Sequence, residues 1–164
     1  MKSKEQVYNM RALIQRVTNS DVTIDGVLTG SIGKGFNILL GVMQGDTKDG
    51  AETLASKIVK LRIFDDPDGK MNLSITDVDG EALVVSQFTL CADCRKGNRP
   101  SFVASAPPAE ADELYEYFCS LLSENGIRKV AKGVFGADMQ VGIMNDGPVT
   151  IWLDTEIFKQ SRRG

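Results

Sequence analysis

The sequence predicts a single α+β domain built on a mainly antiparallel, barrel-like sheet with two main helices. The chain has 164 residues, a length that favours one domain with a sizeable core. Two segments carry helical periodicity, and the apolar segments around them have the length and alternation of strands. Because no repeat or linker divides the chain, we expect one domain over residues 10–158. An N-terminal extension at 1–9 and a flexible tail at 159–164 would flank it.

The first half of the predicted sheet comes from three apolar segments. Residues 10–25, MRALIQRVTNSDVTID, are strand-like, and Asp25-Gly26 is a turn signal before a candidate hairpin partner, VLTGSIG. Phe36–Val42, FNILLGV, is a continuous apolar run of strand length. Such a run indicates a central strand.

Two segments are predicted to be helical. Residues 47–64 carry apolar side chains at i, i+4 and i+7, and Asp46 or Thr47 can cap their start. The second helix begins near Pro107-Pro108, because proline suits a first turn, and Gly126 is a candidate stop. The apolar stripes consist of Leu54, Ile58 and Leu61 with Ala51 and Ala55 in the first helix, and Leu114, Tyr115, Phe118, Leu121 and Leu122 in the second.

The remaining segments supply turns and further strands. Residues 65–70, DDPDGK, are dense in turn-forming residues. Residues 71–90 resemble two strands around Asp79-Gly80. Residues 139–154 alternate like two strands broken at Asn145–Pro148.

Composition is that of an ordinary globular protein, with 42% apolar and 25% charged residues. No apolar run reaches the ~18 residues that a membrane helix needs. The first ten residues, MKSKEQVYNM, lack the apolar region of a secretory signal. We therefore expect a cytoplasmic protein whose three cysteines are reduced thiols.

The absence of histidine narrows the chemistry further. With 0 histidines the chain cannot form a Ser-His-Asp triad, a Cys-His dyad or a His-ligated zinc site. We expect no metal ion and no cofactor. Proton transfers in an enzyme of this composition run through carboxylates, Lys, Tyr, thiols, water or the substrate itself. The net charge of −3 gives no global basic field, so nucleic acid would have to bind a local patch.

Polar residues follow one apolar strand where it ends. Ser86, Gln87, Phe88 and Thr89 come directly after the run Ala82–Val85. Burying polar groups costs free energy unless something bonds to them. This stretch is therefore either a set of structural hydrogen-bonding groups or a site.

Two short motifs receive structural interpretations. CADC at Cys91–Cys94 has the spacing of a redox motif, but a basic loop follows it where a thioredoxin-like site has a helix. We interpret these thiols as incidental. GSIGKG at residues 30–35 matches neither of the phosphate-loop motifs G-x-x-x-x-G-K-[ST] and G-x-G-x-x-G. We predict that it is a turn between strands.

Two loops remain candidates for function. Arg95, Lys96 and Arg99 are either a solvated charge run or a contact for a phosphate backbone, and both interpretations stay open. NDGPVT at Asn145–Thr150 places Gly-Pro between two apolar strands, where a tight turn is the simpler interpretation. The residues alone do not determine whether the Gly147-Pro148 bond is cis or trans.

These stretches together carry a resemblance to a known family. ALIQRV near the start, then GKMNLS, LVVSQFTL, RPSF, ADMQV and NDGPVT in this order, resemble the D-aminoacyl-tRNA deacylases, also called D-tyrosyl-tRNA deacylases. The similarity runs from Met10 to about Leu153. The CADC cysteines depart from the pattern and receive no role from it.

The resemblance implies a function and a site. The enzyme would hydrolyse D-aminoacyl-tRNA, and also mischarged glycyl-tRNA, while it rejects the L-form. Ser86–Thr89 would line the active site. Gly147 and Pro148, with Asn145 beside them, would form a Gly-cis-Pro element inserted into the partner's pocket of a homodimer. Arg16 would support that element, and Phe135 and Met139 would lie near the terminal adenosine of tRNA.

Two mechanisms and two rival classes remain open at this stage. Thr89 could be a nucleophile, although no base lies near it in sequence. Alternatively, the ribose 2′-hydroxyl assists an attacking water while backbone N–H groups near Phe88 and Thr89 hold the carbonyl oxygen, and we favour this mechanism. A pure RNA-binding module would need only the basic loop. A thiol redox protein would need a cysteine of low pKa.

Overall fold

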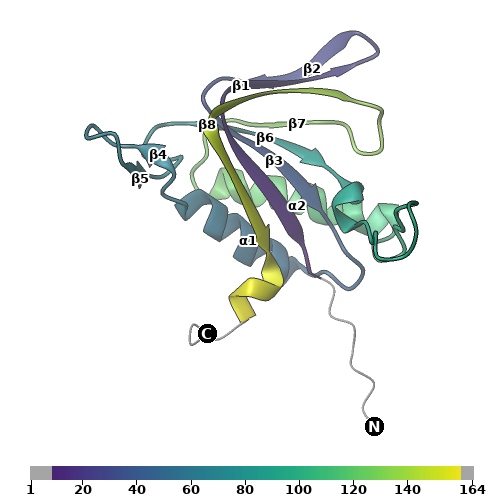
Figure 1. The fold of residues 1–164 in the computed structure, drawn as a ribbon. Coiled ribbons are helices and arrows are strands. Elements are labelled where there is room, and N and C mark those ends of the chain that lie inside the picture. The colour runs from purple at the N-terminus through teal and green to yellow at the C-terminus, as the bar shows by residue number, and fades with distance from the viewer. Residues whose placement is uncertain (1–8, 160–164) are drawn as a thin grey trace.

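The dominant feature is a mixed sheet that curls almost into a barrel (Figure 1). The computed structural model describes residues 9–159. In the six-stranded sheet the strand order is β2-β1-β3-β6-β7, and β8 also pairs with β1, whereas β4 and β5 form a separate pair. The strands are β1 (Arg11–Ile24), β2 (Val27–Ile32), β3 (Gly35–Gly41), β4 (Phe64–Asp65), β5 (Met71–Leu73), β6 (Glu81–Ser86), β7 (Val130–Lys132) and β8 (Gln140–Asp154).

Strand pairing divides the sheet into two parts. β1 pairs antiparallel with β2, β3 and β8, while β3, β6 and β7 are parallel to one another. Parallel neighbours need long crossover connections. The chain supplies them with α1 (Lys48–Lys60) between β3 and β6, and with α2 (Pro108–Glu124) between β6 and β7. The predicted fold class is confirmed. The strand patterns in the sequence did not reveal that β3, β6 and β7 pair in parallel.

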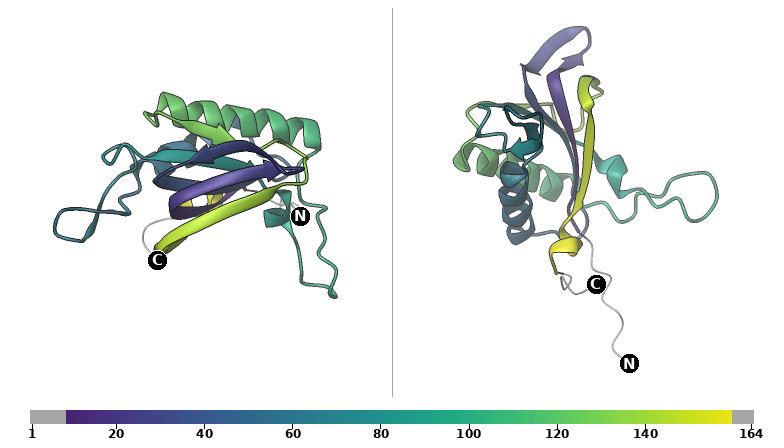
Figure 2. Two further views of the ribbon diagram at one scale, coloured as in Figure 1. Left: turned by 90° about the horizontal axis from the view of Figure 1, so that it is seen from above. Right: turned by 60° about the vertical axis from the view of Figure 1, so that its left-hand side comes forward.

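Both helices lie on the same side of the sheet, where they pack against each other and close the main core (Figure 2). The predicted apolar stripes of both helices are buried, apart from the half-buried Leu61. A second, smaller cluster fills the concave side of the sheet, where β2 approaches β7. A Cβ added at Gly30 would lie 3.0 Å from the carbonyl oxygen of Lys132. The members of this inner cluster are Val17, Val22, Ile32, Leu83 and Val85.

Several predicted turns are confirmed. Asp25 (φ 50°) and Gly26 (φ 79°) connect β1 to β2, and the GSIGKG segment turns from β2 into β3. α2 begins at Pro108, and Gly126, with φ 110°, follows its last turn. No helix in the described part of the chain is long and apolar enough to cross a membrane.

Three boundaries differ from the sequence prediction. α1 ends at Lys60 instead of residue 64, because Phe64 leaves the helix to join β4 and stack on Phe36 at 5.1 Å between ring centroids. β5 pairs with β4 instead of forming a hairpin with β6. The predicted strand up to residue 90 ends at Ser86, and Phe88–Cys91 form the 3₁₀ helix η1. In each case a tertiary partner overrides the local pattern.

The two ends of the chain are only partly described. Residues 1–8 of the proposed extension and 160–164 of the proposed tail lie outside the described residues. Asn9 is buried, and its side-chain amide donates a hydrogen bond of 3.2 Å to Glu156 Oε2. The 3₁₀ helix η2 (Thr155–Lys159) follows β8. The extension and the tail therefore stay predictions.

Candidate active site

A cavity of about 560 Å³ opens at the carboxyl end of β6. Its walls come from the end of β6, the start of η1, the first turn of α2 and the segment before β8. Most of the lining is apolar, and its polar side chains are those of Ser86, Gln87, Ser105 and Asp138. The predicted site residues that line it are Ser86, Gln87, Phe88, Phe135 and Met139.

The strand-end segment, Ser86–Cys91, contributes Ser86, Gln87 and Phe88 to this cavity. The N–H of Gln87 donates to Leu40 O at 2.8 Å, which continues the β3–β6 ladder by one residue. The chain then turns into η1, and the Gln87 side-chain amide donates to Thr89 Oγ1. Thr89 is exposed and is not part of the cavity lining. The Thr89 hydroxyl thus accepts a hydrogen bond from an amide, and an amide cannot act as a base for the hydroxyl proton.

Packing and backbone contacts fix the strand-end segment against β3. Arg11 Nη1 donates to Leu90 O at 2.9 Å. A Cβ added at Gly41 would lie 2.9 Å from Leu90 Cβ, so glycine is what lets η1 come this close. The buried Cys91 thiol donates to Val42 O at 3.5 Å. Burial raises the pKa of this thiol to about 11, so it stays protonated at neutral pH.

The opposite wall of the cavity is built from residues before β8. The ring of Phe135 lies 6.4 Å from that of Tyr115, whose hydroxyl donates to Val84 O at 2.7 Å. Met139 lies over Gly133, where an added Cβ would be 2.6 Å from its sulfur. This wall presents a flat aromatic ring and an adaptable thioether to the cavity.

The β8 bend, Asn145–Thr150, interrupts the long ladder between β1 and β8. Thr150 pairs with Gln15 and Asn145 with Val17, so the four residues 146–149 oppose Arg16 alone. The structure therefore has one continuous strand with a large bulge where the sequence predicted two strands. The Gly147-Pro148 peptide bond is cis, the isomer that the family resemblance implies. Figure 1 shows the sharp change in the direction of β8.

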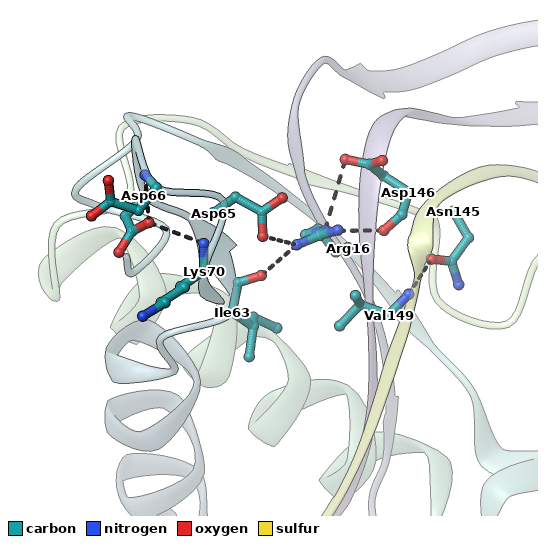
Figure 3. Close-up of polar contacts among 9 residues, drawn as sticks. Arg16, Ile63, Asp65, Asp66, Lys70, Asn145, Asp146 and Val149 are labelled. Carbon is teal, nitrogen blue, oxygen red and sulfur yellow. Dashed lines mark hydrogen bonds and ion pairs between the residues drawn. The ribbon is translucent and has the colours of Figure 1, made fainter. Parts of the chain in front are cut away.

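Two side chains hold the β8 bend in place (Figure 3). Arg16, only 7% exposed, donates from Nε to Asp146 O at 3.0 Å. Asn145 Oδ1 accepts from the N–H of Val149 at 3.0 Å, and its amide donates to Thr150 Oγ1 at the same distance. Gly147 has φ 129°, a conformation that L side chains rarely adopt. The side chains of this bend serve to shape its backbone.

The structure brings some predicted site residues together and leaves others apart. Five of them share the cavity, and Thr89 lies beside it. Asn145, Gly147 and Pro148 are not among the residues that line this cavity. Within one chain, the β8 bend and the strand-end segment are thus separate features.

The basic loop projects away from the sheet between η1 and α2 (Figure 2). Arg95 forms an ion pair of 2.7 Å with Asp93, and its hydrogen bonds help lower the pKa of that carboxyl to about 2. Lys96 and Arg99 are exposed. The local positive charge is therefore carried mainly by these two residues.

Sequence reasoning missed the residues that complete the site from a distance. Ser105 and Ala106, just before α2, and Pro108, its first residue, line the cavity, and Arg11 holds η1. Small residues near a helix start carry no functional signal. Only the fold brings them to the same cavity as Ser86.

Comparisons with known proteins agree on one family. The family model described as D-Tyr-tRNA(Tyr) deacylase matches residues 13–154. A D-aminoacyl-tRNA deacylase of Ruegeria pomeroyi is 57% identical over 145 residues, covering 88% of this chain and 99% of the relative. One from Cereibacter sphaeroides is 56% identical, covering 89% of this chain and 100% of the relative.

Solved structures share the fold. A protein named c-Myc DNA Unwinding Element Binding Protein has a TM-score of 0.83 at 42% identity, with 87% of this chain and 97% of that chain covered. A probable eukaryotic D-amino acid tRNA deacylase has a TM-score of 0.76, with 89% of this chain and 99% of that chain covered. Because the two sequences are only 16% identical, this match shows the fold alone. With the family model matched over most of its length, the chain belongs to the D-Tyr-tRNA(Tyr) deacylase family.

Proposed function

We propose that this protein hydrolyses the ester bond of D-aminoacyl-tRNA, releasing free D-amino acid and tRNA. The observation that carries the proposal is the polar strand-end segment beside a 560 Å³ cavity in a chain of this family. Such a cavity suits a nucleoside, because an aromatic ring and apolar side chains can stack on a base while polar groups orient the ribose. Phe135 and Met139 would contact the terminal adenosine, and Ser86 and Gln87 would orient the ester.

The mechanism asks little of the protein's side chains. An aminoacyl ester is already activated, so a strong protein nucleophile is unnecessary. The chain has 0 histidines, and Thr89 Oγ1 accepts from Gln87, which leaves this hydroxyl without a general base there. The ribose 2′-hydroxyl would assist an attacking water. Backbone N–H groups near Phe88 and Thr89 would hold the developing oxyanion.

Chiral selection would come from the β8 bend. In this proposal Gly147 and Pro148 present bare backbone carbonyls to the α-carbon of the aminoacyl group. An L side chain would collide with these carbonyls whatever its chemistry, whereas a D side chain would point away. Glycine has no side chain to collide, so glycyl-tRNA would be cleared as well.

The assembly would be a homodimer in which each bend completes the partner's cavity. The bend does not line the cavity of its own chain, so a second copy is needed to bring the two together. β8 also carries exposed apolar side chains, Met144 at 59% and Trp152 at 44% exposure, that such an interface could cover. The basic loop, with Arg95, Lys96 and Arg99, would contact tRNA phosphates. Because its substrate is a translation intermediate, the enzyme would act in the cytoplasm.

The first experiment measures release of tyrosine from D- and L-tyrosyl-tRNA. We expect rapid release from the D-form and a much slower release from the L-form, measured at high enzyme concentration. Equal rates for both enantiomers would refute chiral selection. No release from either, with the protein folded, would refute the enzymatic function.

The second experiment tests the shared site by mixing two inactive variants. Gln87→Ala damages the cavity and Gly147→Ala damages the bend. After subunit exchange, half of the dimers are hybrids with one intact site, so about a quarter of wild-type activity should return. If the mixture stays inactive although exchange is verified by mass spectrometry, the two elements do not meet across an interface.

A further inference from the structure

Arg16 contacts a second element besides the β8 bend. Its Nη1 donates to Ile63 O at 2.8 Å and lies 3.5 Å from Asp65 Oδ1, both in or beside β4. Its Nε donates to Asp146 O at 3.0 Å. Figure 3 shows the guanidinium between these two sets of acceptors. One buried side chain thus connects the β4–β5 hairpin (Phe64–Leu73) to the bend.

The hairpin is held by contacts that do not involve Arg16. Phe64 is buried and stacks on Phe36. In the turn that follows, Asp66 Oδ1 accepts from the N–H groups of Asp68 at 2.9 Å and Lys70 at 3.0 Å. Asp66 also donates its own N–H to Lys70 O at 2.8 Å. The hairpin can therefore act as a fixed support for Arg16.

Guanidinium geometry makes this support directional. The group is planar, so acceptors on the Nη1 side determine where Nε points. Asp146 Oδ2 lies 3.8 Å from Nε, so a carboxylate is present on each side of the group. Without Asp65, the nearby Asp146 carboxylate would draw the guanidinium away from the Asp146 carbonyl that defines the bend.

We propose that Asp65 is a positioning residue for enantiomer selection, acting through Arg16 on the Gly147-Pro148 bend. The inference rests on the proposed function of that bend as the chiral filter. Asp65 touches neither the cavity nor the bend, and its side chain is 55% exposed. Its effect should therefore be moderate, and it should appear in the D/L rate ratio more than in stability.

The test compares two aspartates of the same hairpin. Asp65→Ala should lower the ratio of D- to L-tyrosyl-tRNA hydrolysis about threefold to tenfold. Asp68→Ala is the matched control, since Asp68 is exposed and bonds Asp66 through its backbone N–H. It should stay within about twofold of wild type. Asp65→Glu, which keeps a carboxylate near Arg16, should recover most of the loss. Equal effects of Asp65→Ala and Asp68→Ala would overturn the proposal.

A double-mutant cycle separates action through Arg16 from a local effect. Arg16→Lys keeps the charge but loses the planar fork. In that background Asp65→Ala should cause no further change in the D/L ratio. A further loss as large as in the wild-type background would overturn the proposal, because Asp65 would then act by another route.

Hydrogen exchange tests the coupling without any assay of activity. In Asp65→Ala the peptide that contains Val149 should take up deuterium faster, whereas Asp68→Ala should leave its uptake unchanged. Unchanged uptake in Asp65→Ala overturns the inference alone. If the wild-type protein hydrolyses D- and L-tyrosyl-tRNA equally, the proposed role of the bend as the chiral filter is refuted. The deuterium uptake of the Val149 peptide then still shows whether the hairpin holds the bend.

Discussion

The strand-end segment and the β8 bend reach their shapes in opposite ways. The strand-end segment follows a parallel strand, and groups outside it hold its backbone: β3 accepts from the Gln87 N–H, and the Arg11 side chain donates to Leu90 O. The bend interrupts an antiparallel ladder and is held by side chains, those of Arg16 and Asn145. A parallel neighbour thus supplies a preformed strand end, whereas a bulge must be shaped by groups outside the ladder.

This difference predicts where the protein is sensitive to mutation. Apart from Gln87, which would orient the ester, side-chain changes in the strand-end segment leave its backbone anchors in place, so their effects should be modest. Changes in the bend remove the groups that define its backbone and should cost more. Four predictions, from the largest expected effect to the smallest, test this ranking.

Gly147→Ala should have the largest effect. The added methyl group would lie 2.9 Å from Val149 Cγ2 and 3.0 Å from Arg16 Nη2, at a φ of 129° that alanine rarely adopts. A conformational cost of about 2–3 kcal/mol corresponds to roughly 30- to 150-fold in rate. The measurement is single-turnover hydrolysis of D-tyrosyl-tRNA.

A glycine with the same kind of backbone serves as its control. Gly26 has φ 79°, and an added Cβ would meet nothing within 4 Å. Gly26→Ala should leave activity within about twofold, because backbone strain at the β1–β2 turn does not involve the bend. If both variants lose activity equally, the loss comes from general destabilisation, and the comparison of the two regions fails.

Asn145→Ala should rank second. It removes the acceptor for the Val149 N–H and the donor to Thr150 Oγ1. Losing these bonds should cost about 1–2 kcal/mol, roughly 5- to 30-fold in the D-tyrosyl-tRNA rate. Asn145→Asp keeps the acceptor for Val149 and should lose less. Full activity of the alanine variant would mean that Arg16 alone shapes the bend.

Thr89→Ala should have a smaller effect than either bend variant. The hydroxyl is exposed and accepts a hydrogen bond from the Gln87 side chain, so we expect its loss to cost about 1 kcal/mol, roughly fivefold in rate. Loss of a true nucleophile typically costs on the order of 10⁶-fold. A loss of that size, or an acyl group trapped on Thr89, would reverse the ranking and the mechanism.

How much of this could be predicted from the sequence depends on whether a pattern is local. The hairpin at Asp25-Gly26 and the start of α2 follow from turn and capping chemistry, and both are as predicted. The resemblance pointed to five of the residues that line the cavity and to the bend. The end of α1 at Lys60 and the pairing of β4 with β5 depend on Phe64 stacking on Phe36, a contact that no local pattern encodes.

The bend illustrates the same limit in the site. Alternation on both sides of Asn145–Pro148 predicted two strands, but a bulge of four residues opposite Arg16 preserves one strand. The link from Arg16 to Ile63 and Asp65 joins residues 47 and 49 positions apart. From the sequence, only the family resemblance assigned a role to Arg16. Asp65 was predicted only to be part of a turn.

The smallest effect should come from the cysteines that end and follow η1. Cys91→Ser and Cys94→Ser should each leave D-tyrosyl-tRNA hydrolysis within about twofold, since serine at residue 91 can still donate to Val42 O. Reactive cysteines need a thiolate, and burial instead raises the pKa of Cys91 to about 11. Inactivation of wild type by a thiol-blocking reagent at pH 7 that Cys91→Ser prevents and Cys94→Ser does not would show that Cys91 is reactive after all.

The raised pKa has its own consequence at high pH. In the unfolded chain the Cys91 thiol titrates near 9.0, whereas in the folded protein it stays protonated to about 11. Above pH 9 the unfolded state therefore binds fewer protons, and the free energy of unfolding falls as pH rises towards 11. Cys91→Ser removes this titrating group, so its melting temperature should fall less between pH 8.5 and pH 10.5 than that of wild type. An equal fall in both proteins would assign the alkaline loss to other buried groups, such as Cys119, whose pKa burial raises to about 12.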